Sequence, residues 1–549
     1  MTTAPKPPRL GVVTQGAFNL GLTVRLDPGT STEHLRIGSF VVVEGERHRY
    51  FSLIADMSLQ AADPRIAADP PRDASDFIRT VLAGTTTYAT LEIKPQLMLD
   101  MRQEGTDAPT GPLPVRTIPM HFAALREAGE MDFHTVFGEP DALHFAMGTP
   151  LTMDIPICID LEKWTQRSNG IFGQSGTGKS FLARLMLCGA IKSKVASNLI
   201  FDMHDEYAFG KESEDGVFVK GLRDLFGAQI RVYSLDEASS RRSGRSVDQV
   251  LKIGLNQIEP EDILLLAEEL NLRATAESSI GLLQDRFKQQ WLVRLIEMST
   301  DDLTEFCKQA NSSEAALGAL QRNLKRIARQ EYITSQAEYS QIDEMMHIFE
   351  QKGHVILQYG KFNSLLDYML VANVITRRVR ESYVKQAGQY EQSHDKADEP
   401  HPLVITIEEA HKFLNPGVAR QTIFGTIARE LRKYRVTLMV IDQRPSGIDS
   451  EIMSQLGTRV TGKLTDERDI ESVFTGASGR SFLRGALESL DTKQEVLLLG
   501  HAVPMPIQVR TRKYDEAFWR EMGHMSQEEK KDKARKDLAD LGLAQPRKK

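Results

Sequence analysis

The sequence predicts an α/β protein in which a parallel β-sheet, covered by helices, follows a small β-rich domain. Three observations lead to this class. Short β-branched segments occupy roughly the first 150 residues, and apolar strands alternate with helical segments from about residue 155. A glycine-rich loop then joins one of these strands to a helix, as in nucleotide-binding α/β proteins.

Length, charge and cysteine content narrow the class further. The 549 residues are enough for several domains at about 150 residues each. A net charge of -7 excludes a globally basic nucleic-acid coat protein, but it allows a basic channel inside an acidic particle. The three cysteines are widely spaced, which argues against a disulfide framework or a zinc knuckle. With no signal peptide and no run of 18 apolar residues, we expect a cytoplasmic protein with no membrane partner.

Residues 1–150 form the predicted N-terminal domain, a small barrel or sandwich. Its short strands are separated by turn signals such as Asp27-Pro28-Gly29. The expected strands are Leu10–Val13, Gly38–Glu44, Tyr50–Ala55 and Tyr88–Ile93. The polar segment Asp107–Pro114 is predicted to be a loop, and the domain boundary is placed near residues 145–155.

Residues 151–525 form the predicted sheet domain, followed by a charged tail at 526–549. The expected strands are Gly170–Gly173, Asn198–Met203, Gly353–Tyr359, Leu403–Ile407, Thr437–Asp442 and Glu495–Gly500. Between about 258 and 345 the strand signal gives way to amphipathic segments, including Ile263–Leu270, Ser279–Glu297 and Ser313–Ile333, which predict a helical insertion. The polar stretch Ala387–Pro400 predicts a mobile loop.

The loop Gly173-Gln-Ser-Gly-Thr-Gly178-Lys179-Ser180 matches the P-loop pattern GxxxxGK[ST] between a strand and a helix. Glycines allow backbone N–H groups to surround phosphates, and the helix N-terminus adds a positive end. Lys179 is expected to contact the β- and γ-phosphates of ATP, and the Ser180 hydroxyl to hold Mg²⁺. The predicted nucleotide contacts are Gly173, Gly176, Thr177, Gly178, Lys179, Ser180 and Phe181.

Two further apolar strands end in polar residues at the edge where the P-loop is expected. After Leu403–Ile407 come Glu408, predicted to stand on the Mg²⁺ side, and Glu409, predicted to be the catalytic base. Gln443 follows Thr437–Asp442 and is predicted to sense the γ-phosphate and orient water. A strand that ends in two glutamates could also be the solvated start of a helix. Because the sequence also contains a P-loop, we interpret Glu408 and Glu409 as part of a catalytic site.

Three other charged groups each allow two interpretations. Of the arginines in Ala428–Arg435, Arg432 is preferred over Arg429 and Arg435 as an arginine finger for a neighbouring subunit; otherwise the run is a solvated helix face. Asp202, His204 and Glu206 could couple the nucleotide to a neighbour or simply form a strand-end turn. A stripe of basic residues at helical spacing is either a solvated helix face or a contact with DNA phosphates; it comprises Arg322, Lys325, Arg326 and Arg329.

The order of these motifs resembles the HerA family of DNA-translocating ATPases in the FtsK–HerA superfamily. The resemblance runs from about residue 8 to 515 and is strongest over Gly170–Tyr207 and Leu403–Val460. The family usually carries Asp where this chain has Glu408, and Asp-Pro-His-Gly-Glu-Tyr where this chain has Asp202–Tyr207. The family's Gly-Arg-Lys corresponds to Leu431–Lys433, which supports Arg432.

The resemblance implies a RecA-like core preceded by a HerA-type barrel. It also implies a homo-hexamer with ATP between subunits and double-stranded DNA in a central pore. A nuclease or another effector would dock on the N-terminal domain, in DNA end processing or anti-phage defence. Two alternatives stay open: an ATP-assembled scaffold that activates an effector with little translocation, and a conjugation-type ATPase that moves protein or single-stranded DNA.

Overall fold

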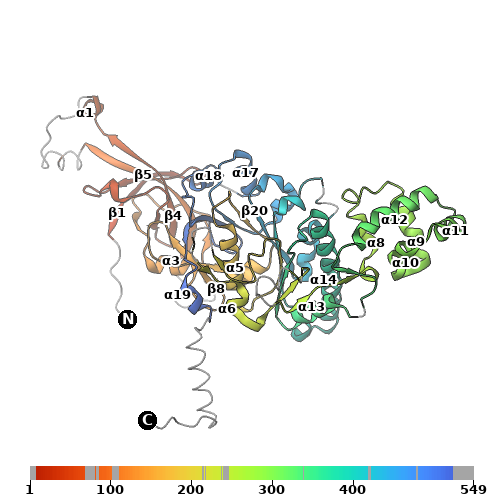
Figure 1. The fold of residues 1–549 in the computed structure, drawn as a ribbon. Coiled ribbons are helices and arrows are strands. Elements are labelled where there is room, and N and C mark those ends of the chain that lie inside the picture. Colours follow the sequence, from red (N-terminus) through yellow and green to blue (C-terminus); the bar gives the residue numbers. More distant parts are fainter. Residues whose placement is uncertain are drawn as a thin grey trace, which may run out of the picture. The chain divides into compact units, whose positions relative to one another are not determined.

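The chain divides into two compact units in the computed structural model. The structure describes residues 8–523 apart from 69–80, 82–85, 102–110, 213–215, 217, 237, 239–246, 338, 418, 420–421 and 478–479. Unit 1 comprises Met1–Asp160 with Ala477–Arg512, and unit 2 comprises Leu161–Gly476 with Lys513–Lys549 (Figure 1). The domain limits 1–150, 151–525 and 526–549 remain a prediction. The charged tail and the first half of the predicted loop Asp107–Pro114, residues 107–110, lie outside the described residues, and Leu113–Pro114 at its end form a strand.

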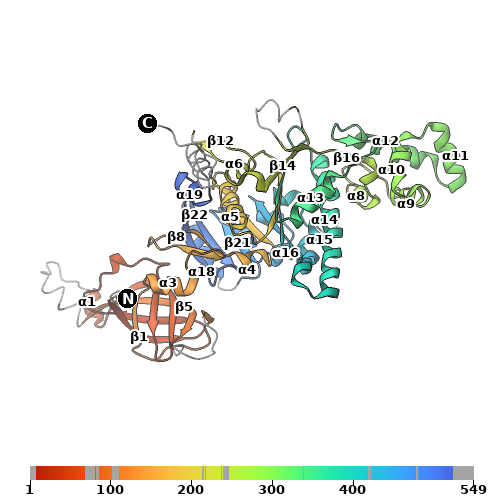
Figure 2. The ribbon, with the colours of Figure 1, turned by 90° about the horizontal axis from the view of Figure 1, so that it is seen from below.

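Unit 1 contains the small barrel that the sequence predicts. Six described strands pair in the order β2-β1-β7-β3-β4-β5, and β2 pairs with β5 to close the ring (Figure 2). These are β1 (Arg9–Ala17), β2 (Gly21–Leu26), β3 (Phe40–Glu44), β4 (His48–Ala61), β5 (Thr87–Asp100) and β7 (Ala124–Glu127), with β6 (Leu113–Pro114) added beside β5. Alternating side chains such as Val24, Val41 and Ile93 point inward and are fully buried. This alternation produces the apolar pattern from which the sequence predicts the strands.

The rest of unit 1 is a four-stranded antiparallel group, β22-β23-β8-β9, with two helices. Its elements are β8 (His144–Pro150), β9 (Ile157–Asp160), β22 (Glu495–Gly500), β23 (Ile507–Thr511), α3 (Glu130–Phe137) and α18 (Arg480–Glu488). The strand Glu495–Gly500 forms as predicted, and it pairs antiparallel with β23. Phe133 of α3 packs edge-on against Phe40 and Phe51 and so anchors this helix on the barrel.

Unit 2 is built on eight described parallel strands in the order β15-β14-β18-β11-β19-β20-β10-β21. They are β10 (Asn169–Phe172), β11 (Ser197–Asp202), β14 (Ile230–Ser234), β15 (Gln249–Val250), β18 (His354–Gln358), β19 (Leu403–Glu408), β20 (Val436–Asp442) and β21 (Thr458–Thr461). Every residue of the central strands β11, β18, β19 and β20 is buried, as expected when helices cover both faces. This order places β10 next to β20 and β11 next to β19, so their carboxyl ends share one edge.

The helices of unit 2 connect these strands. They include α4 (Leu161–Thr165), α5 (Lys179–Ser193), α6 (Leu222–Phe226), α13 (Gln341–Glu350), α14 (Leu365–Ser393), α15 (Ile423–Glu430), α16 (Ser450–Gln455), α17 (Glu467–Val473) and α19 (Glu516–Glu521). Across the described residues, no helix is sufficiently long and apolar to cross a membrane.

The predicted helical insertion is present between β16 (Ile253–Gly254) and β17 (Ile333–Thr334), which pair in parallel at its base. It contains α8 (Pro260–Leu264), α9 (Ala276–Phe287), α10 (Trp291–Glu297), α11 (Thr300–Ala310) and α12 (Glu314–Ala328) (Figure 1). The amphipathic segment Ser279–Glu297 is divided between α9 and α10, because the chain turns at Lys288 with a φ of 51°. The fully buried Trp291 donates to the carbonyl of Ile258 and fixes the new helix direction.

The mobile loop predicted for Ala387–Pro400 is wrong. Helix α14 continues through Ser393, reaching 29 residues, and a short turn over Lys396–Asp398 follows. Tyr383 and Ala387 are buried along one face of this extension, and Glu399 pairs with Arg435. A polar stretch can therefore stay helical when two apolar positions suffice to hold one face.

Candidate nucleotide site

The P-loop lies between β10 and α5. Gly176 and Gly178 have φ values of 81° and 84°, in the left-handed region that glycine adopts without strain. Gly178 caps α5, and Lys179 is the first residue of that helix. The carbonyl of Gln174 accepts hydrogen bonds from Thr177 Oγ1 at 2.8 Å and Lys179 Nζ at 3.1 Å. The loop is thus curled on itself at the positive end of a 15-residue helix, the arrangement that suits a polyphosphate.

Acidic residues end the strands beside the P-loop. Asp202 closes β11, Glu408 closes β19 and Asp442 closes β20, and all three are buried. Burial lowers the pKa of Lys179, while four carboxylates oppose that shift through their charges: Glu409, Asp442, Glu408 and Glu206. The structure therefore brings the predicted Lys179, Glu408 and Glu409 into one electrostatic cluster, together with two acids from neighbouring strand ends.

Glu408 has one oxygen held and one open. Tyr207 donates its hydroxyl to Glu408 Oε1 at 2.8 Å, whereas Oε2 is buried and has no hydrogen bond with any described residue. Burial, reinforced by the charge of Asp202, raises the pKa of Glu408 to about 8. An open buried carboxylate oxygen with excess negative charge nearby fits a divalent cation, and with the Ser180 hydroxyl it gives an all-oxygen donor set of the kind Mg²⁺ prefers.

Glu206 lies on the Ser180 side of this cluster. Burial acts to raise its pKa, but the hydrogen bond with Ser180 and the charge of Lys211 outweigh it, so that the pKa is lowered. Lys211 Nζ lies 3.3 Å from Glu206 Oε1. Of the three candidates after β11, His204 is exposed, and Asp202 accepts the backbone N–H groups of Glu206 and Tyr207, which makes it the anchor of a strand-end turn.

Glu409 stands in a left-handed backbone conformation, with φ 49° and ψ 45°, at the start of a short turn over Ala410–Lys412. Its Oε2 lies 3.7 Å from Nδ1 of His411, which is itself bound to Asp442. Gln443, the first residue after β20, is half-buried. Sequence reasoning missed the roles of Tyr207 and Asp442. Asp442 carried a usable signal, because it ends a buried strand in the same way as Glu408.

Known proteins are similar to this chain over most of its length. Residues 145–379 match the family described as "Helicase HerA, central domain". The DNA double-strand break repair helicase HerA of Sulfolobus acidocaldarius is 23% identical over 495 residues, covering 88% of this chain and 90% of that protein. The protein of the same name from Sulfurisphaera tokodaii is 26% identical over 501 residues, covering 88% and 89%. This chain is a P-loop ATPase similar to the HerA helicases.

VirB4 of Thermoanaerobacter pseudethanolicus aligns with a TM-score of 0.45 and 15% identity, covering 70% of this chain and 100% of that one.

The arginines of Ala428–Arg435 differ in their surroundings. Arg429 donates to the carbonyl of Ala419, and Arg435 forms an ion pair with Glu399. Arg432 is exposed on the turn Leu431–Tyr434, and its side chain makes no hydrogen bond or ion pair with another described residue. Within its own chain, Arg432 therefore has the least engaged side chain of the three.

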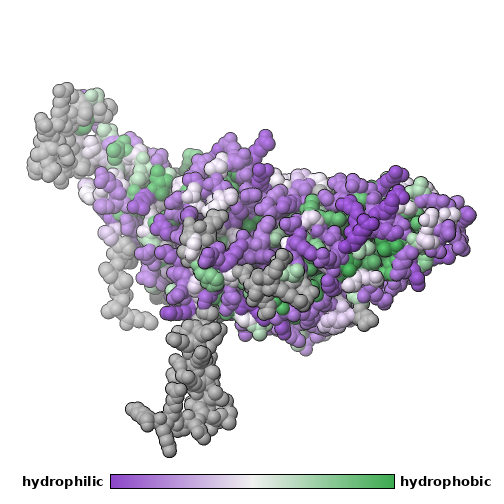
Figure 3. Space-filling view, viewed as in Figure 1, coloured by the Kyte–Doolittle hydropathy of each residue, from purple (hydrophilic) through white to green (hydrophobic). Residues whose placement is uncertain are grey.

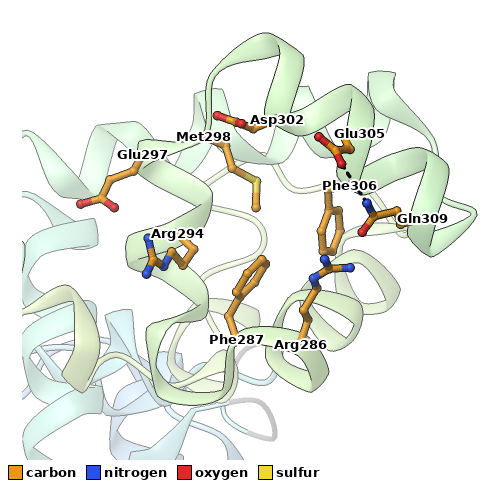
Figure 4. A pocket seen from close by; sticks show the side chains of 9 residues that line it. All are labelled: Arg286, Phe287, Arg294, Glu297, Met298, Asp302, Glu305, Phe306 and Gln309. Atoms are coloured by element: carbon orange, nitrogen blue, oxygen red, sulfur yellow. Dashed lines mark hydrogen bonds between the residues drawn. The ribbon is translucent and has the colours of Figure 1, made fainter.

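The helical insertion carries a basic stripe and a pocket. Arg322, Arg326 and Arg329 are exposed along α12 and its cap, as their helical spacing predicts. A pocket of about 400 Å³ lies between α9, α10 and α11 (Figure 4). In it Phe287 and Phe306 stack 5.8 Å apart, and the guanidinium of Arg286 lies over both rings. Both features lie in the insertion, outside the P-loop cluster.

Proposed function

We propose that this P-loop ATPase is the subunit of a six-membered ring that uses ATP hydrolysis to move along double-stranded DNA. The observation that carries the proposal is the cluster of Lys179, Glu408 and Glu409 at one edge of a parallel sheet. The relatives named above, which cover nearly nine-tenths of this chain, are named as DNA repair helicases and support DNA as the track.

Each residue of the cluster has one task in hydrolysis. Lys179 and the P-loop N–H groups bind the β- and γ-phosphates, and Ser180 and Glu408 hold Mg²⁺. Mg²⁺, when bound, neutralises charge that develops on the phosphate oxygens. Glu409 orients the attacking water and accepts its proton, and Gln443 holds the water on the side of β20. The proposed reaction also requires a cation that faces the γ-phosphate.

A neighbouring subunit supplies that cation in our proposal. The exposure of Arg432 and its side chain's lack of partners among the described residues support its choice as the arginine that reaches the next subunit's ATP. Hydrolysis then changes the subunit interface, which couples chemistry to movement of the DNA in the pore.

The N-terminal unit is proposed to join neighbours and to dock a nuclease or another effector, in DNA end processing or anti-phage defence. Large apolar side chains are exposed on it, including Phe18, Leu20, Met120 and Phe122 (Figure 3 shows apolar surface in green on this unit). Exposed apolar groups of this size are typical of interaction surfaces. The same observation favours the second candidate, a ring that ATP assembles and that recruits an effector with little translocation.

Displacement of a third strand from a DNA triplex separates the two candidates. The motor predicts that the wild type displaces the strand with ATP, that Glu409→Gln still binds ATP but displaces none, and that Lys179→Ala loses both activities. A matched control is Glu430→Gln, an exposed acid at the end of α15, which should behave as wild type. A wild-type ring that hydrolyses ATP without displacing the strand would contradict the motor and favour the scaffold.

A further inference from the structure

The turn that follows β11 contacts both groups expected to face Mg²⁺. Its base is Asp202, a fully buried carboxylate that accepts the backbone N–H of Glu206 at 2.7 Å and that of Tyr207 at 3.0 Å. These two bonds fix the direction in which two consecutive side chains leave the backbone. Glu206 then pairs with Ser180, and Tyr207 pairs with Glu408.

The Tyr207–Glu408 contact has the geometry of a positioning interaction. The Tyr207 side chain is fully buried, and its hydroxyl donates to Oε1 of Glu408 at 2.8 Å. The bond occupies one oxygen and leaves Oε2 buried without a hydrogen bond to any described residue. A phenol on one oxygen and an open second oxygen is the arrangement of a metal-ligating carboxylate whose outer partner sets its orientation.

The length of the Glu408 side chain explains why the hydrogen bond from Tyr207 matters. Glu408 has one more rotatable bond than an aspartate at the same strand end, so it loses more rotamer freedom when it is held in one place. A hydrogen bond from a rigid aromatic side chain offsets that loss. Asp202 in turn holds the backbone of Tyr207, so the phenol has a fixed origin.

We propose that Tyr207 is a positioning residue that orients Glu408, leaving Oε2 to bind the Mg²⁺ of the Mg²⁺–ATP complex. This inference rests on the proposed function, because it takes Glu408 and Ser180 as the metal-facing groups. It adds that the turn Asp202–Tyr207, which the phosphates need not contact, sets the metal affinity of the site.

The test measures binding of a non-hydrolysable ATP analogue to the full chain by calorimetry, with and without graded Mg²⁺. Tyr207→Phe removes only the hydroxyl. It should raise the Mg²⁺ concentration needed for tight binding by roughly 10- to 100-fold, the effect typical of losing an outer-shell partner. Affinity for the analogue without Mg²⁺ should stay unchanged.

Tyr332→Phe is the matched control. Tyr332 is also a buried phenol and donates to a carboxylate, Asp367 Oδ1, at 2.7 Å, but outside the P-loop cluster. Tyr332→Phe removes the same kind of hydrogen bond and should leave the Mg²⁺ dependence of analogue binding unchanged. If Tyr207→Phe and Tyr332→Phe both match the wild type in Mg²⁺ dependence, the proposal is overturned.

A double-mutant cycle separates an effect that passes through Glu408 from any other effect of Tyr207→Phe. Glu408→Asp withdraws the carboxylate from the phenol, so the proposal predicts that adding Tyr207→Phe to Glu408→Asp changes the Mg²⁺ dependence no further. An undiminished effect of Tyr207→Phe in the Glu408→Asp background contradicts it. Wild-type binding that ignores Mg²⁺ would instead refute the assigned metal site, and loss of strand displacement alone would refute only the motor.

Discussion

Asp442, at the end of β20, accepts the backbone N–H of His411 at 2.6 Å, and its Oδ2 also lies 2.9 Å from Nδ1 of the same histidine. This double contact ties the turn after β19 to the neighbouring strand. Glu409 lies two residues before His411 and is held in a left-handed backbone conformation. The orientation of the proposed base therefore depends on a carboxylate of another strand.

Replacing Asp442 should slow ATP hydrolysis without weakening ATP binding. Asp442→Asn removes the charge and one of the two acceptor oxygens, so that the turn carrying Glu409 shifts. A misplacement near 1 Å costs up to roughly 100-fold in rate. Steady-state turnover should fall by that order while the KM for ATP stays near the wild-type value.

Asp395→Asn is a suitable control for the Asp442 variant, because Asp395 also accepts a backbone N–H, that of Ala397, in an exposed turn. It should retain wild-type turnover. Equal turnover in Asp442→Asn and wild type would show that the contact with His411 does not position Glu409.

Arg432→Ala should abolish most turnover, and mixing should restore part of it. If Arg432 acts on a neighbour's ATP, an Arg432→Ala subunit keeps an intact Glu409, and a Glu409→Gln subunit beside it supplies the missing arginine. Co-assembled rings should then hydrolyse ATP faster than either variant alone, measured as phosphate release.

Arg435→Ala provides the comparison for the arginine experiment. Arg435 is paired with Glu399 in its own chain, so its loss should leave turnover near wild type. Mixed rings that are no more active than the two variants measured separately would exclude a trans-acting Arg432.

Acid should destabilise unit 2 through His354, the first residue of β18. Burial, followed by the charge of His401, lowers the pKa of His354 to about 3, and Asn198 Nδ2 lies 3.1 Å from its Nδ1. In the unfolded chain, His354 has its ordinary pKa near 6.5, so it binds a proton below that pH, whereas the buried His354 of the folded state stays neutral. The free energy of unfolding should thus fall with pH below about 6.5, by about 2 kcal/mol at pH 5.

Denaturant unfolding of the wild type and His354→Gln between pH 7.5 and 5 checks this prediction. The variant cannot take up the proton, so its stability should decline less steeply as the pH falls, whatever its stability at pH 7.5. If the free energy of unfolding falls equally in both proteins as the pH is lowered, His354 does not take up a proton on unfolding in this pH range, and the prediction is wrong.

The arginines of α12 distinguish a DNA contact from a solvated face. Changing Arg322, Arg326 and Arg329 to Gln together should weaken duplex binding if they bind phosphates. The slope of log affinity against log salt should then become shallower by about 0.9 for each phosphate that is no longer neutralised. Fluorescence anisotropy with a labelled duplex at several salt concentrations measures both quantities.

A charge-matched control uses three exposed basic residues on other elements, Lys396, Arg468 and Lys513, each changed to Gln. If both triple variants lower affinity equally, the effect is one of net charge. The insertion then carries only a solvated face.

The grouping of Lys179, Glu408 and Glu409 was predictable, because it depends on local sequence. The P-loop is contiguous, and Glu408 directly ends an apolar strand, so both could be assigned without knowing the fold. Tyr207 could not be assigned in this way. Its contact with Glu408 joins residues 201 positions apart and depends on β11 and β19 being neighbours in the sheet.

The fold was predictable where a periodic pattern was unbroken. Strand β22 forms with the predicted bounds, but its antiparallel partner β23 depends on pairing that one segment cannot reveal. The short strands β14 and β21 lie in mixed sequence and were not predicted. The end of α14 was misjudged because its polar composition outweighed two buried positions, Tyr383 and Ala387.

The central claim, a DNA-driven ATPase ring, is tested most directly by one measurement. ATP turnover of the purified protein is recorded with and without linear duplex DNA, and the mass of the particle is determined in the same buffer. We predict a particle of six 61.6-kDa subunits whose ATP hydrolysis is stimulated by duplex DNA. A six-subunit ring whose weak hydrolysis ignores DNA, or a monomer with full activity, would contradict it.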